Sequence, residues 1–310
     1  SRQLAEARKD SWLGDGSSSV QQQALRDFDQ ALKNWWGGSH RRPTWRSFHK
    51  GHRSFKVRDV TVTKLNRKWA TIGVPKLGPI KFRLSRPLPA EYGMATISQD
   101  RAGRWHVSFT APQPTFHREQ TGAEVGVDMG VTHGISTSDG WHASPAGLTA
   151  GEKRRKLALQ RRLARQCKGS NRRAVTKAKL ARLSARERDR RKDWIEQTST
   201  RLVRDYDLIA LEALNVRNMM RSAKGTVEKP GKNVARKAAL NRGIASVGWA
   251  ELRTRIEQKA TAATSPVVVV AVDPRNTSRR CAACGHTEEA NRESQAFACR
   301  ACGHHAHADV

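Results

Sequence analysis

Hydrophobic and polar positions change their spacing along the chain, first near residue 54. Apolar residues recur at helical spacing in VQQQALRDFDQALKNWW (residues 20–36), which predicts an amphipathic helix. We expect its apolar side chains to pack in a small helical bundle; they are Ala24, Phe28, Leu32 and Trp35. Between residues 54 and 111, short alternating segments separated by turn residues predict the strands of a small β-barrel or sandwich.

A second pattern begins near residue 123 and predicts an α/β domain. The segment AEVGVDMGVTHGISTS predicts two strands joined by a turn at Gly130, and residues 153–192 predict a long helical stretch. Two more strands, YDLIALEAL and SPVVVVAVDP, flank the helix predicted by ASVGWAELRTRIEQKATAA. The unbroken run of valines is typical of a strand buried on both faces of a parallel sheet. This succession favours a sheet with helices packed on it.

The charge balance indicates a polyanionic partner. The chain has 58 Lys and Arg against 28 Asp and Glu, a formal net charge of +30. An excess of this size repels itself unless a polyanion such as nucleic acid neutralises part of it. A merely solvated basic surface is the alternative. No apolar run approaches the ~20 residues that a membrane-spanning helix needs, so we expect no membrane partner.

Two basic segments are candidates for direct contact with nucleic acid. The loop at residues 37–57 mixes cations with aromatic side chains that can stack on bases. Residues 153–192 include 18 Lys and Arg but only two acids, Glu187 and Asp189, so we do not expect internal pairing of the cations. A half-buried loop and a solvated helix are the alternatives. The candidate contacts are Trp45, Arg46, Arg53, Arg154, Arg155, Arg161, Arg162, Arg172 and Arg173.

Four of the five cysteines form a metal-binding pattern. Cys281-x-x-Cys284 and Cys299-x-x-Cys302 are separated by 14 residues, and a glycine follows each pair. Each pair offers two thiolates at neighbouring corners of a tetrahedron, and each glycine permits a tight turn. We therefore expect a closed, structural zinc site of four thiolates. Redox cysteines and disulfides are the alternatives, and Cys167 stays outside the pattern.

Three carboxylates stand at positions where an acid is costly or unexpected. Asp128 lies inside an apolar strand, Glu212 ends the hydrophobic run LIAL, and Asp309 follows the cysteine pairs. A buried carboxylate needs a cation or a hydrogen-bonding partner, so each one alone could be a strand-end cap or an ion-pair partner. Gathered on one sheet, the three would form a site for two divalent cations about 4 Å apart, which activate water for phosphodiester cleavage.

Taken in order, the motifs resemble those of the TnpB/OrfB transposon-encoded nucleases, which are relatives of type V CRISPR effectors. The matching segments are GVDMGV, LIALEALNVRNM, GWAELRTRIEQKA, VVVVAVDPRNTSRRCAACG and CRACGHHAHADV. The resemblance is strong from residue 124 to 310 and weaker before it. The segments around the cysteines are the specific ones, whereas GVDMGV alone would be a weak signal.

The resemblance implies a multidomain α+β protein. Residues 1–42 would be a helical recognition segment, and residues 43–118 a β-barrel wedge-like domain. Residues 119–277 would be an RNase H-like (RuvC) nuclease domain, an α/β unit that includes the basic helices at 153–192. A zinc ribbon inserted at 278–304 would precede residues 305–310, the start of the last RuvC motif. Since the family has a strand before this start and a helix after this end, we expect a chain trimmed at both ends.

The resemblance also implies a function and its cofactors. Asp128, Glu212 and Asp309 would be catalytic acids that bind Mg²⁺, while the zinc would be structural. The implied activity is RNA-guided cleavage of double- or single-stranded DNA, with a guide transcribed from the transposon end, at the nucleoid in the prokaryotic cytoplasm. A catalytically inactive RNA-guided DNA-binding protein and a DNA-strand transferase on the same fold are alternatives. A structural RNA binder would leave Asp128 and Glu212 without a role. The oligomeric state stays undefined.

Overall fold

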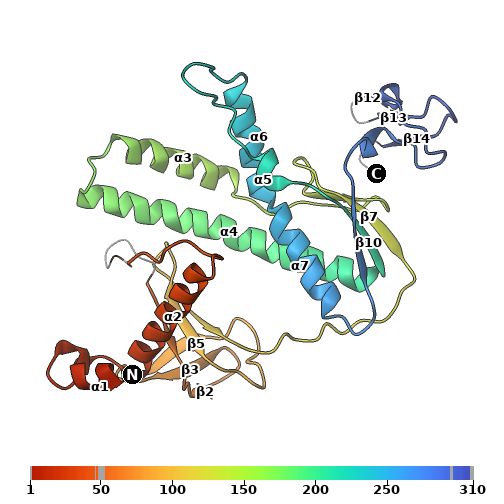
Figure 1. The fold of residues 1–310 in the computed structure, drawn as a ribbon. Coiled ribbons are helices and arrows are strands. Elements are labelled where there is room, and N and C mark those ends of the chain that lie inside the picture. Colours follow the sequence, from red (N-terminus) through yellow and green to blue (C-terminus); the bar gives the residue numbers. More distant parts are fainter. Residues whose placement is uncertain (1, 46, 48–52, 294–295, 308–310) are drawn as a thin grey trace. The chain divides into compact units, whose positions relative to one another are not determined.

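The computed structural model describes residues 2–45, 47, 53–293 and 296–307. The chain folds into two compact units (Figure 1), which are Ser1–Gln113 with Arg162–Arg182, and Pro114–Arg161 with Leu183–Val310. Each unit has a hydrophobic core of its own. Two of the predicted site residues, Arg46 and Asp309, lie outside the described residues.

The first unit begins with α1 (Arg2–Ala7), a 3-10 turn (Trp12–Asp15) and α2 (Ser18–Trp36), so the predicted amphipathic helix is confirmed. The expected burial of its apolar face in a bundle is wrong, because Phe28 is 44% and Trp35 36% exposed. A different face of α2 meets the neighbouring strands. Val20 packs on their core, and Lys56 Nζ lies 2.9 Å from Asp27 Oδ1 in an ion pair on the same side of the helix.

Two three-stranded antiparallel sheets complete this part of the first unit. One consists of β1 (Ser54–Val57), β5 (Ala95–Gln99) and β6 (Trp105–Phe109); the other consists of β2 (Val62–Lys64), β3 (Trp69–Val74) and β4 (Gly78–Arg83). Side chains alternate between the faces of a strand, and the inward ones from both sheets share one core. Its buried members are Val57, Ile72, Val74, Ala95 and Ile97. The predicted strands of this region are confirmed.

The second unit is built on a five-stranded mixed sheet in the order β11-β10-β7-β8-β9. The strands are β7 (Glu124–Asp128), β8 (Ile135–Thr137), β9 (His142–Ala143), β10 (Leu208–Glu212) and β11 (Val268–Val272). β10 pairs in parallel with both β7 and β11, whereas β8 and β9 continue the sheet antiparallel from β7. Numbered along the chain within this sheet alone, the strands lie in the order 5-4-1-2-3.

Helices lie between the strands along the chain. They are α3 (Ala150–Arg165), α4 (Asn171–Asp205), α5 (Val216–Met219), α6 (Val234–Val247) and α7 (Trp249–Thr261). Of these, α4, α6 and α7 supply buried side chains to the core on the sheet. Leu202 of α4 and Ile256 of α7 are fully buried in one core with Ile209 of β10. None of the helices in the described part of the chain is long and apolar enough to cross a bilayer.

Within the described residues, only one face of the sheet is well covered. In β7 and β10 the second and fourth residues are buried and the others are less so. The valines of β11 were expected to be buried on both faces, which is wrong: Val268 is 53% and Val270 40% exposed. β11 lies at the edge of the sheet, and in the described part of the chain no helix buries its outer face. By the same alternation, Asp128 and Glu212 belong to this more open face.

A small cysteine-containing element follows β11. Two 3-10 turns, η2 (Thr277–Arg279) and η3 (Glu289–Asn291), precede an antiparallel sheet of β12 (Arg292–Glu293), β13 (Ala296–Ala298) and β14 (His305–His307). Among the described residues of this element, the buried members of its core are Cys281, Phe297 and Cys299. A core this small needs a further stabilising contribution.

Candidate active site and metal centre

Two neighbouring parallel strands bring two of the three predicted acids together. Val127 of β7 is in register with Leu211 of β10, so Asp128 and Glu212, the next residues, end the two strands side by side. The two carboxyl groups share a hydrogen bond. Asp309, the third predicted acid, lies outside the described residues. The structure therefore brings an acid pair together at the carboxyl ends of two neighbouring strands.

The acid pair carries an electrostatic cost. Burial, the charge of Asp128 and the hydrogen bond with Asp128 together raise the pKa of Glu212 to about 7. Thr277 opposes this shift, because its hydroxyl lies 3.2 Å from Glu212 Oε1 and donates to it. Two carboxylates this close do not both ionise readily unless a cation joins them. A divalent cation would remove the proton and hold both charges.

The donor set fits a hard divalent cation such as Mg²⁺. Mg²⁺ prefers oxygen ligands and is usually held by one or two protein carboxylates while it keeps several waters. Asp128 and Glu212 offer two such carboxylates on the more open face of the sheet, where waters and a phosphate have access. Whether Asp309 completes the ligand set stays a prediction.

In the absence of divalent cations, we expect Glu212→Gln to melt at a higher temperature than the parent protein at pH values above about 7. Near pH 4 the two proteins should melt at the same temperature. The folded protein binds the Glu212 proton more tightly than the unfolded chain does. This contribution to stability is complete below the ordinary pKa of 4.5 and is lost as the pH rises through about 7. Glutamine stays neutral and avoids the loss. Thermal melts from about pH 4 to 8 measure the difference.

Glu124→Gln is the matched control, because Glu124 begins the strand that Asp128 ends. We expect its melting temperature to follow that of the parent protein across the range. A Glu212→Gln difference that does not grow with pH would contradict the electrostatic description of the pair.

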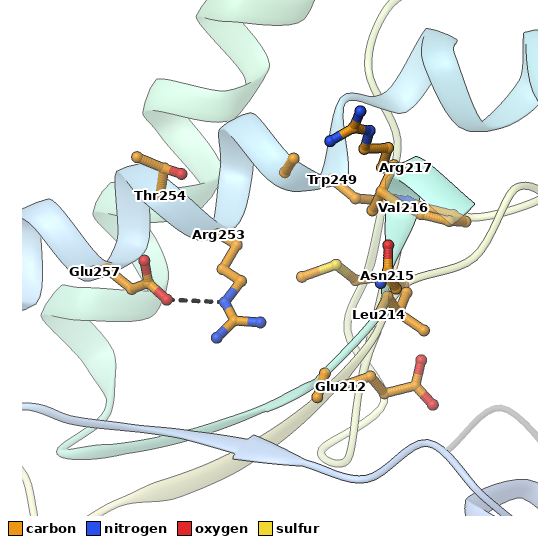
Figure 2. A pocket seen from close by; sticks show the side chains of 12 residues that line it. Glu212, Leu214, Asn215, Val216, Arg217, Trp249, Arg253, Thr254 and Glu257 are labelled. Atoms are coloured by element: carbon orange, nitrogen blue, oxygen red, sulfur yellow. Dashed lines mark hydrogen bonds and ion pairs between the residues drawn. The ribbon is translucent and has the colours of Figure 1, made fainter. Parts of the chain in front are cut away.

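A pocket of about 580 Å³ opens beside Glu212 (Figure 2). The pocket is lined by Met129, the turn after β10, α5 and the first two-thirds of α7. Arg253 of α7 reaches into it and donates through Nε to Glu257 Oε1 (2.8 Å), and Arg217 of α5 also lines it, beside Trp249. Sequence reasoning missed both arginines, since single arginines among 58 basic residues give no signal of position.

The four predicted zinc ligands converge on one point. Their Sγ atoms all lie within 4.8 Å of one another. The Sγ atoms of Cys281 and Cys302 are 3.6 Å apart, as are those of Cys284 and Cys299. A tetrahedron with 2.3 Å zinc–sulfur bonds has edges of about 3.8 Å, whereas a disulfide is only about 2.05 Å long. The thiols are therefore free and placed to bind zinc.

Both halves of the cysteine site use the same backbone turn. The amide of Gly285 donates to Cys281 O (2.9 Å), and that of Gly303 donates to Cys299 O (3.0 Å). The φ angles of the two glycines are 73° and 72°, a left-handed conformation that glycine adopts without a steric penalty. These turns position the thiolates, which explains why a glycine follows each cysteine pair.

The basic helices α3 and α4 are partly paired internally, contrary to our expectation. Glu152 accepts hydrogen bonds from Arg186 (2.6 Å) and Arg190 (2.7 Å), which lower its pKa to about 2, and Glu187 pairs with Lys156. The expectation was wrong because Glu152, one residue before the counted stretch, pairs with two arginines, and because Glu187, inside the stretch, pairs with Lys156 across the two helices. These pairs fix the two helices against each other and leave most of the remaining cations at the surface.

The predicted nucleic-acid contacts differ in accessibility. Five arginines of the helices are exposed: Arg154, Arg155, Arg161, Arg162 and Arg172. Arg173 is only partly exposed, since its guanidinium donates to the carbonyls of Leu163 and Gln166 at the end of α3. In the first unit, Arg53 is exposed, and Trp45 is 91% exposed with its ring stacked on Phe28 at a centroid distance of 6.0 Å. Arg46 lies outside the described residues.

Two family models match the chain. Residues 106–223 match OrfB of IS605, described as a probable transposase, and residues 249–310 match the TNB domain of the Cas12f1-like family. A protein of Escherichia coli K12, whose name describes an RNA-guided DNA endonuclease, InsQ, is 35% identical over 306 residues. That alignment covers 98% of this chain and 75% of the relative. The chain belongs to the TnpB/OrfB family.

Membership in TnpB/OrfB confirms the resemblance that the motifs indicate. A Streptomyces pristinaespiralis protein, also named for RNA-guided DNA endonuclease activity, is 33% identical over 250 residues, which cover 80% of this chain and 58% of the relative. Among solved structures, the mini-RNA-guided endonuclease CRISPR-Cas_phi3 aligns with a TM-score of 0.40 and 13% identity over 78% of this chain and 56% of its own. CasPhi-2 bound to crRNA aligns with a TM-score of 0.39 and 14% sequence identity. That alignment covers 78% of this chain and 59% of the CasPhi-2 chain.

Proposed function

We propose that this TnpB/OrfB chain is an RNA-guided, Mg²⁺-dependent DNA endonuclease. The main support is the Asp128–Glu212 pair. Its two hydrogen-bonded carboxyl groups at adjacent strand ends repel each other when both are ionised, and a bound divalent cation would offset that repulsion. The names of the relatives from Escherichia coli and Streptomyces support the RNA-guided and DNA-cleaving parts. The whole protein's substrates and partners are part of the proposal, since the chain spans only part of both relatives.

The sheet order supports an RNase H-like (RuvC) nuclease domain. Three antiparallel strands, β7 to β9, continue into the parallel strands β10 and β11, and the acids end the first and fourth of the five. This arrangement agrees with the fold that the family resemblance implies. The cysteine-containing element after β11 agrees with a zinc ribbon inserted at 278–304. In this proposal residues 1–42 are the helical part and residues 43–118 the wedge-like part, which together hold RNA and flanking DNA.

Asp128, Glu212 and Asp309 would hold Mg²⁺, which when bound activates a water and stabilises the leaving oxygen of a phosphodiester. The protein's own part is positional. The strand ends fix the spacing of two carboxylates, and their placement on the open face admits the DNA strand. Hydrolysis breaks one P–O bond, adds water across it, and leaves a 3′-hydroxyl and a 5′-phosphate. The zinc would be structural, because four thiolates leave it no open position.

Exposed arginines supply the surface for nucleic acid. Arg154, Arg155, Arg161, Arg162 and Arg172 would contact the phosphates of a guide–target heteroduplex, which proteins recognise by shape and charge rather than by sequence. Trp45, stacked on Phe28, would offer a ring face to a base. We propose that the guide RNA is transcribed from the transposon end, as the family resemblance implies.

The products of the reaction distinguish this function from its alternatives. Protein with co-purified RNA would be incubated with Mg²⁺ and end-labelled DNA that matches the RNA. We expect cut DNA with free 3′-hydroxyl and 5′-phosphate ends. Joined strands would favour a strand transferase, because water and hydroxyl attack use the same two-cation chemistry. DNA that is bound tightly but stays intact would favour an inactive, RNA-guided binding protein.

A further inference from the structure

Thr277 connects the acid pair to the cysteine-containing element. It begins η2, the turn between β11 and Cys281, and its Oγ1 lies 3.2 Å from Glu212 Oε1. The same hydroxyl also lies 3.2 Å from Pro274 O, but once Glu212 is ionised, as it would be on a bound cation, its carboxylate is the stronger acceptor of the single hydroxyl proton. The bond occupies one oxygen of Glu212 and leaves the other for a cation.

A buried asparagine ties the other end of η2 to both cysteine turns. The Nδ2 group of Asn291 donates to Arg279 O (3.0 Å) in η2 and to His286 O (3.3 Å) in the first turn. Its Oδ1 accepts from the amide of Arg300 (2.9 Å) in the second turn. Asn291 is 1% exposed, so these bonds are shielded from water. When the cysteines hold zinc, the positions of both turns are fixed, and with them the position of η2.

We propose that Thr277 is a positioning residue through which the zinc-bound cysteine element orients Glu212 for divalent-cation binding. The inference rests on the proposed function, because it assumes that Asp128 and Glu212 hold the cation. Zinc would then have two effects: it stabilises the cysteine element, and through η2 it aligns a ligand of the second metal. Groups that orient a ligand from behind in this way commonly contribute 10–100-fold to metal affinity.

Isosteric substitutions test the hydroxyl itself. Thr277→Val keeps the branched shape and removes the donor, whereas Thr277→Ser keeps the donor. The probe is Mn²⁺, titrated into zinc-loaded protein with its RNA and followed by the electron paramagnetic resonance of free Mn²⁺. We expect Thr277→Val to lower the affinity of the acid pair for Mn²⁺ about tenfold. The Mn²⁺ affinity of Thr277→Ser should stay within about twofold of that of the parent protein. Thr287→Val, an exposed site in the first cysteine turn, should have no effect.

Zinc removal tests the connection. In protein stripped of zinc and dialysed free of chelator, we expect Mn²⁺ binding by the parent to weaken about as much as in Thr277→Val. In Thr277→Val itself, zinc removal should change the Mn²⁺ affinity by less than about twofold, because the hydrogen bond that connects the two sites is already missing. The proposal would be overturned if zinc removal and Thr277→Val together lowered the Mn²⁺ affinity by the product of their separate effects. It would also be overturned if Thr277→Val bound Mn²⁺ as tightly as the parent protein.

Asp128→Ala in the same titration separates this inference from the proposed function. Ions bound by RNA are common to all variants, so the difference from Asp128→Ala isolates the ion held by the acid pair. If Asp128→Ala binds Mn²⁺ like the parent, the acid pair is not a cation site and the proposed function fails. If Asp128→Ala loses the ion but Thr277→Val keeps it, only the role of Thr277 fails.

Discussion

Replacing Asp128 by alanine is expected to abolish DNA cleavage while leaving the binding of RNA and DNA nearly intact. The substitution removes one of two carboxylates that would hold the catalytic cation, and such a cation contributes several kcal/mol to the transition state. At about 1.4 kcal/mol per factor of ten, the cleavage rate should fall at least about a thousandfold. Single-turnover cleavage and equilibrium binding, measured on the same preparation, check both halves of the prediction.

Asp193→Ala is the matched control. Asp193 is an exposed acid of α4 whose Oδ2 accepts a hydrogen bond from Gln197 (2.9 Å), far along the chain from either strand end. We expect it to cut DNA at the parent rate. Cutting that survives in Asp128→Ala would refute the role of the acid pair, and an equal loss in Asp193→Ala would point to a general effect of removing an acid.

Cys299→Ser is expected to release zinc, unfold the cysteine-containing element and weaken DNA binding. Cys299 is 4% exposed, and in the part of the element that the structure describes, its core has two other buried members, Cys281 and Phe297. In small zinc-binding elements the metal itself supplies about 10–16 kcal/mol of apparent binding free energy, which is folding free energy. Zinc content, limited proteolysis of residues 278–304 and DNA affinity should change together.

Cys167→Ser controls for the loss of a thiol. Cys167 is exposed and lies outside the four-cysteine group, so its replacement should leave zinc content and DNA affinity unchanged. A chelated protein that melts and resists protease like the untreated one would contradict a structural role for the metal.

The cysteine site and the acid pair could be predicted from the sequence because their signals lie within short segments of the chain. Cysteine spacing and the following glycines determine a turn within a few residues, and the structure has that turn twice. Asp128 and Glu212 each end an apolar segment, and strands that pair in parallel bring such ends to one edge. The catalytic role of the pair and the place of Asp309 stay predictions.

Features that depend on contacts between distant segments could not be predicted. The apolar face of α2 was expected to be buried, but another face, with Val20 packed on the core and Asp27 paired to Lys56, 29 residues away, meets the strands. The valines of β11 were expected to be buried on both faces, yet β11 lies at the edge of the sheet and Val268 and Val270 are exposed. Thr277 carries no signal in the sequence, because its contact with Glu212 spans 65 residues.

Cleavage of DNA matched to the co-purified RNA tests the proposed activity most directly. The measurement compares matched and scrambled DNA, each with Mg²⁺ and with a chelator that removes it. We predict cutting only where the match and Mg²⁺ are both present, and none with Glu212→Gln although that variant still binds the matched DNA. Equal cutting of scrambled DNA, or cutting that persists without a divalent cation, would contradict an RNA-guided nuclease built on the acid pair.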